Sequence, residues 1–144
     1  MTQTSAGATE VARRLWTLAS QGDPTTQDPA AAVTRLCTGL RTGLVRWIGT
    51  DGYQALLLRA LAQAGAQHTW LAELGCVEGA LNGMRSATAG RRPADVAEGM
   101  VGLVANLVHV LGRITGEEMA LRLVEHAWTA GASAKARSGR RDND

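Results

Sequence analysis

Residues 93–128 read PADVAEGMVGLVANLVHVLGRITGEEMALRLVEHAW, and this stretch decides the fold. Pro93 suits the first turn of a helix, where its missing N–H costs nothing. Thr115 and Glu118 have the spacing of a capping box, which marks the start of a second helix. The large apolar residues recur at spacings of three and four, the period of helices with one buried face: Met100, Leu103, Val104, Leu107, Val108 and Leu111, then Ala120, Leu123, Val124, Ala127 and Trp128. The stretch therefore predicts a helical hairpin that turns at Gly116.

A second hairpin of the same kind lies 67 residues earlier in the sequence. In this register, Gly49 aligns with Gly116 and Asp51 with Glu118. The apolar residues of the first helix also align: Val33, Leu36, Cys37, Leu40 and Leu44 with Met100, Leu103, Val104, Leu107 and Leu111. Each hairpin alone would expose an apolar face, so the two are expected to pack against each other. We predict an all-α bundle of four core helices, arranged as two pseudo-repeated hairpins with an N-terminal helix beside them.

Three regions are expected along the chain. Residues 1–22 form an N-terminal helical arm, in which Thr9 caps a helix over residues 9–20. The apolar side of that helix is formed by Val11, Leu15, Trp16 and Leu18. Residues 23–130 form the bundle domain, whose first helix opens with Asp28 as N-cap and Pro29 as first helical residue. Residues 131–144 are rich in Gly, Ala, Ser, Lys and Arg without periodicity and are expected to be a disordered basic tail.

Residues 75–92 are the least regular part of the predicted bundle, because four glycines interrupt them. A short helix is expected over residues 77–84 within this segment. Just before it, residues 68–74 are expected to form one helical turn. No part of the chain shows the alternation of apolar and polar residues that is typical of a strand.

The composition bounds the class of protein. A hydrophobic fraction of 45% with 19% charged residues is typical of a folded globular chain. The net charge of +2 is too small to indicate a nucleic-acid partner. The first residues lack a secretory signal, and no run of 18 apolar residues exists, so we expect a cytoplasmic protein without a membrane span. Cys37 and Cys76 lack CxxC spacing and are expected to be buried, reduced thiols.

No catalytic constellation is found in the sequence, which contains three histidines and neither an HExxH motif nor a phosphate-binding glycine loop. We therefore expect no enzymatic activity, no cofactor and no metal. One helix carries a stripe of small and polar residues, formed by Gly99, Gly102, Asn106, His109 and Arg113. This stripe has two interpretations. It is either a helix crossing eased by glycine, which is favoured, or a ligand groove whose polar contacts are Asn106, His109 and Arg113. In a pocket between the two hairpins, Tyr53 is expected to join these three contacts.

Two of the four tryptophans are predicted to contact a partner, because Trp is favoured at interface hot spots. Trp16 lies on the N-terminal arm and Trp70 in a loop, whereas Trp47 and Trp128 are expected in the core. The segments IGTDGYQALLLRAL (48–61), TWL (69–71) and ITGEEMALRLVEHAW (114–128) resemble those of a group of small, uncharacterised all-α bacterial proteins. The resemblance implies a regulatory role and carries no catalytic motif.

These features favour a non-enzymatic regulatory or adaptor protein that acts through protein–protein contacts. The partner is a second copy of the chain, another protein, or both. The alternative is a bundle that binds a small molecule in a pocket between the two hairpins. The two functions differ in what they require, since a ligand site needs a cavity with convergent polar groups.

Overall fold

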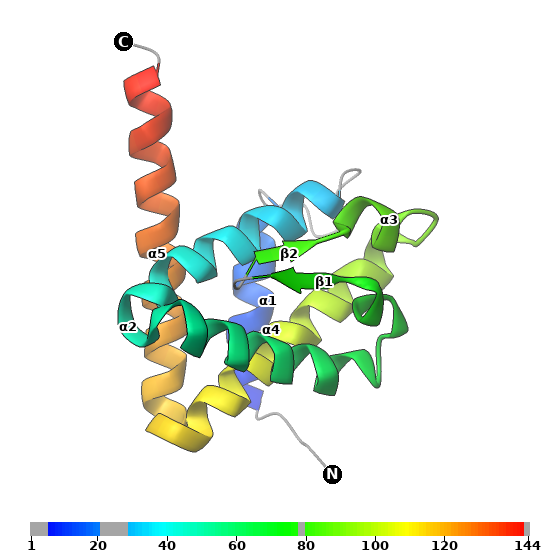
Figure 1. Ribbon diagram of the computed structural model, residues 1–144, viewed down its shortest axis with the longest axis horizontal. Coiled ribbons are helices and arrows are strands. Elements are labelled where there is room, and N and C mark those ends of the chain that lie inside the picture. The colour runs from blue at the N-terminus through cyan, green and yellow to red at the C-terminus, as the bar shows by residue number, and fades with distance from the viewer. Residues whose placement is uncertain (1–5, 21–28, 78–79, 143–144) are drawn as a thin grey trace.

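The computed structural model describes residues 6–20, 29–77 and 80–142, and shows a bundle of packed helices (Figure 1). In chain order its elements are helix α1 (Ala6–Ala19), helix α2 (Pro29–Gly65), the 3₁₀ helix η1 (Thr69–Glu73), strands β1 (Gly75–Val77) and β2 (Ala80–Asn82), and helices α3 (Met84–Thr88), α4 (Pro93–Thr115) and α5 (Glu117–Asp142). The predicted all-α bundle is confirmed. Pro29 and Pro93 open α2 and α4 as expected.

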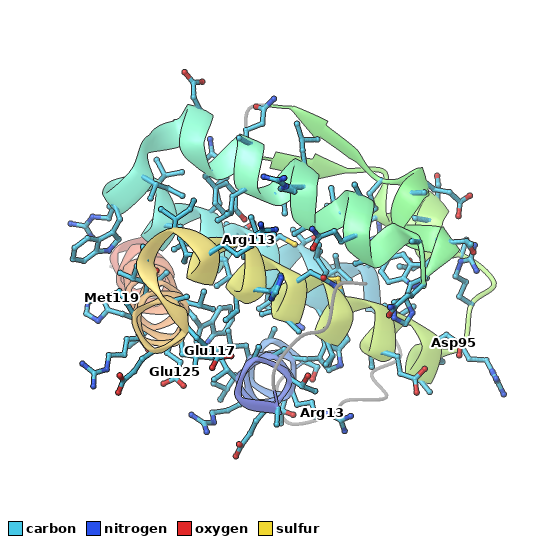
Figure 2. The ribbon with its side chains drawn as sticks, turned by 90° about the horizontal axis from the view of Figure 1, so that it is seen from below. Arg13, Asp95, Arg113, Glu117, Met119 and Glu125 are labelled. Atoms are coloured by element: carbon cyan, nitrogen blue, oxygen red, sulfur yellow. The ribbon has the colours of Figure 1, made fainter. Side chains whose placement is uncertain are left out.

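Both predicted hairpins turn at their glycines. Helix α2 consists of two helical arms joined at Gly49, whose φ of 78° and ψ of 167° are not helical. Gly116, with φ of 91° and ψ of 147°, joins α4 to α5 in a closely similar conformation. A positive φ with an extended ψ is essentially restricted to glycine. Both turns lie at the same end of the bundle, on the left of Figures 1 and 2.

The core repeats as the 67-residue register requires. Aligned residues of the two hairpins are buried alike: Val33 with Met100, Leu36 with Leu103, Leu44 with Leu111, Leu57 with Val124 and Ala60 with Ala127. Helix α4 lies at the centre, between α2 and α1 in Figure 2, and also contacts α5. Among the described residues, α4 is the one helix long and apolar enough to cross a membrane. Most of that apolar stretch is buried inside the bundle, as in the core helix of a globular fold.

Helix α1 is part of the core, packed mainly on α4. It begins at Ala6, three residues before the predicted cap Thr9. Its buried face is formed by Ala8, Val11, Ala12, Leu15, Trp16 and Ala19. Leu18 falls between these positions on the helix and is exposed, so its predicted place on the apolar side was wrong. Polar contacts also join α1 to α2 and α5. Arg35 Nε of α2 donates to the Ala19 carbonyl at 2.7 Å, and Arg14 pairs with Glu125 of α5 at 3.2 Å.

The segment after η1 forms a small antiparallel hairpin, in which Cys76 in β1 lies opposite Leu81 in β2. This corrects the expectation of a short helix over residues 77–84 and of no strand. Strands of three residues are too short to show an alternating pattern, so the sequence gives no signal for them. The helix begins only at Met84, after Gly83 with φ of 80°.

The structure differs from the predictions around α5. Residues 131–142 continue the helix, which extends past the bundle in Figure 1, where the sequence indicates a disordered tail. Ala, Lys and Arg in this segment are strong helix formers, and a single glycine costs a helix about 1 kcal/mol without ending it. The predicted capping box is not formed, because Thr115 is the last residue of α4 and Gly116 directly precedes α5; Thr115 Oγ1 donates to the carbonyls of Leu111 and Gly116. The proposed cap Asp28 lies outside the described residues, and the division into three regions stays a prediction.

Candidate functional site

The four predicted ligand contacts lie in different environments. Tyr53 is buried in the core, and Arg113 is exposed to solvent near the end of α4 (Figure 2). Asn106 is buried and donates from Nδ2 to the Gly102 carbonyl at 2.8 Å, within its own helix. His109 is partly exposed. The residues between the two hairpins form the hydrophobic core, so these four side chains give no argument for a pocket there.

The two glycines of the α4 stripe lie against η1 and against His68, the residue before it. A Cβ atom on Gly99 would lie 2.5 Å from Nε1 of Trp70, and one on Gly102 would lie 3.2 Å from Nε2 of His68. Close packing eased by glycine, the favoured interpretation, therefore fits, and the partner is the short 3₁₀ helix η1. The Trp70 indole N–H is buried and has no hydrogen-bond partner within the described parts of the chain.

The glycines of α2 are also used inside the fold. A Cβ atom on Gly39 would lie 2.7 Å from the Trp128 ring, and one on Gly43 would overlap the backbone of Ala127. These two glycines let α2 and α5 approach closely, so they are not part of an open surface.

Three of the four tryptophans lie in the opposite environment to the one predicted, whereas Trp128 packs against the core as expected. Trp16 and Trp70 are each 2% exposed and belong to the core, so the prediction that they contact a partner was wrong for this fold. Trp16 is covered because α1 packs on α4, and Trp70 because Gly99 leaves room for its indole. Trp47, expected in the core, is 60% exposed. It lies two residues before Gly49, at the end of the first arm of α2.

Three exposed apolar side chains lie within three residues of the two turn glycines. We call Trp47, Ile114 and Met119 the turn-end surface; their exposed fractions are 60%, 77% and 49%. Figure 2 shows Met119 at the end of the molecule where both turns lie. The Trp47 ring packs edge-on against His126 of α5, with centroids 6.3 Å apart and an interplanar angle of 75°. The signal for this surface was present in the repeat, since Trp47 and Ile114 occupy aligned positions before Gly49 and Gly116.

Charged residues flank each apolar side chain in the same order. Arg46 precedes Trp47 and Arg113 precedes Ile114, while Asp51 and Glu118 follow the two glycines. All four charged residues are exposed. Glu118 also makes a weak i,i+4 pair with Arg122, at 3.5 Å. The turn-end surface thus has an apolar centre beside cations and anions.

An open cleft of about 460 Å³ lies between α1 and α4. Its walls include Arg13 and Thr17 from α1, Ala97, Glu98 and Val101 from α4, and His68. In Figure 2, Arg13 lies beside α1 on the side of the N-terminal half of α4. Sequence reasoning missed this cleft because it depends on how α1 docks, which no local pattern predicts.

No group of three metal-ligating side chains occurs within the described residues. Cys37 is partly buried, and the side chain of Cys76 lies outside the part of the chain described. Comparisons with protein-family models, with curated proteins and with solved structures found no match to this chain.

Proposed function

We propose that this chain is a non-enzymatic regulatory or adaptor protein that acts through protein–protein contacts and self-associates through the turn-end surface. The observation that supports the proposal is the exposure of Trp47 at 60%, together with the exposed Ile114 and Met119 close to the second turn in the sequence. Trp is the residue most often found at interface hot spots, and a buried large apolar side chain contributes about 1.5–3 kcal/mol. Trp47 and Ile114 are held at the ends of packed helices, so little conformational entropy is lost when a partner covers them.

The charges around this surface favour a second copy as the partner. In a two-fold contact, the same surface of both protomers meets, and each residue pair occurs twice. Arg46 and Arg113 of one copy can then face Asp51 and Glu118 of the other, because cations and anions alternate around both turns. Such complementarity favours correct pairing more than it adds affinity.

Light scattering after size-exclusion chromatography, over a series of protein concentrations, tests the proposal. The wild-type chain is expected to shift from monomer to dimer as the concentration rises, whereas the double variant Trp47→Ala, Ile114→Ala stays monomeric. Leu18→Ala is the matched control, because Leu18 is exposed to a similar degree but lies on α1. A wild-type chain that is monomeric at every concentration, or a control that behaves like the double variant, would contradict self-association through this surface.

A further inference from the structure

We propose that the cleft between α1 and α4 binds an organic anion with an apolar body, held by Arg13. The proposal is independent of self-association, because the cleft and the turn-end surface share no residue. Its volume of about 460 Å³ falls within the usual range of small-molecule sites, roughly 300–1,000 Å³.

The two walls of the cleft differ in chemistry. On α4, Ala97, Val101 and Ala105 recur every four residues and form an apolar row, with the charged Glu98 beside it. On α1, Thr9, Arg13 and Thr17 recur with the same spacing and present hydroxyl groups and a cation. Eight residues of helix span about 12 Å, so the cleft suits an elongated body of one or two fused or linked rings.

Arg13 is the group of the cleft that can hold an anion. No side chain within the described residues pairs with the Arg13 guanidinium, in contrast to its neighbour Arg14, which pairs with Glu125 at 3.2 Å. His68 contributes a second nitrogen-bearing group, beside Gly102. Glu98 on the opposite wall has no ion-pair partner in the described parts of the chain either, and it opposes an anion. Arg13 is therefore the attractive group and Glu98 the group that limits affinity.

Two dyes of the same shape test the proposal. The probe 8-anilinonaphthalene-1-sulfonate has an apolar body and one sulfonate, whereas N-phenyl-1-naphthylamine has the same body without charge. The fluorescence of both is measured with full-length protein carrying Trp47→Ala, which removes the largest apolar side chain of the turn-end surface. The anionic dye is expected to bind one site saturably and more tightly than the neutral dye.

Single variants then assign the site. Arg13→Gln is expected to weaken binding of the anionic dye about tenfold and to leave the neutral dye unchanged, because one charge-assisted contact is lost. Arg14→Gln, the matched control, should change neither dye more than twofold. Glu98→Gln should tighten one-site binding of the anionic dye and leave the neutral dye unchanged, whereas a loosened fold would bind more of both dyes without saturating at one site. Val101→Trp should fill the cleft and abolish binding of both dyes.

Several results would overturn the assignment. They are equal effects of Arg13→Gln and Arg14→Gln, equal affinity for both dyes, unchanged binding in a folded Val101→Trp variant, or no saturable binding of the anionic dye at all. Far-UV circular dichroism of each variant establishes that it is folded, and if Val101→Trp is not, the Glu98→Gln result decides.

Discussion

At the scale of single residues, the glycines of the two hairpins have two different structural roles. Gly49 and Gly116 supply a backbone conformation, with a positive φ and no atom within 4 Å of an added Cβ. Gly43 supplies space, because its missing side chain lets α2 touch the Ala127 backbone. The first role follows from the sequence through the aligned turns, but the second depends on a contact across 84 residues of chain.

A methyl group added at Gly43 is expected to destabilise the fold, whereas one added at Gly112 is expected to be tolerated. Gly43→Ala is expected to lower the free energy of unfolding by about 2 kcal/mol, because the added methyl group collides with backbone that cannot rotate away. Gly112→Ala is expected to raise it by up to about 1 kcal/mol, since the new Cβ would lie at 3.4 Å from Glu117 Cα and alanine favours the helix. Urea unfolding followed by circular dichroism measures both. Equal changes at the two sites would show that the close approach of α2 and α5 is not rigid.

At the scale of helices and strands, periodicity predicted the core well and the surface poorly. Apolar residues at spacings of three and four identified both hairpins, because the buried face of a helix produces this period in its sequence. It did not distinguish the exposed Trp47 from the buried Trp16, since burial at a helix end depends on what packs there. The strands β1 and β2 were not predicted, because three residues are too few to show the alternation of apolar and polar side chains. The α1–α4 cleft has no local signature either.

The packing of α1 on α4 is expected to contribute strongly to the stability of the bundle. Trp16→Ala is expected to lower the free energy of unfolding by about 3–5 kcal/mol, because a fully buried indole is replaced by a cavity beneath α1. Leu18→Ala, two residues away on the exposed side, is expected to change it by no more than about 0.5 kcal/mol. Thermal and urea unfolding give both values. A small effect of Trp16→Ala would mean that the docking of α1 contributes little to the stability of the bundle.

At the scale of the whole molecule, the turns at one end of the bundle are not covered by any described part of the chain. The apolar faces of the two hairpins are buried against each other and against α1, whereas Gly49 and Gly116 are exposed. The repeated pattern places an exposed apolar residue before each of the two glycines, Trp47 and Ile114. Two molecules that meet at this end would bury four such side chains.

Self-association through this end predicts a thermal midpoint that depends on protein concentration. A dimer that forms only from folded chains stabilises the folded state by mass action. For a chain of this size, each tenfold rise in concentration is expected to raise the midpoint by about 2–4 °C. Trp47→Ala should abolish this dependence, and Leu18→Ala should preserve it. Differential scanning calorimetry over a hundredfold range of concentration measures the slope. If the wild-type chain unfolds reversibly and its thermal midpoint does not change with protein concentration, self-association through Trp47 is contradicted, and a different protein becomes the expected partner of this side chain.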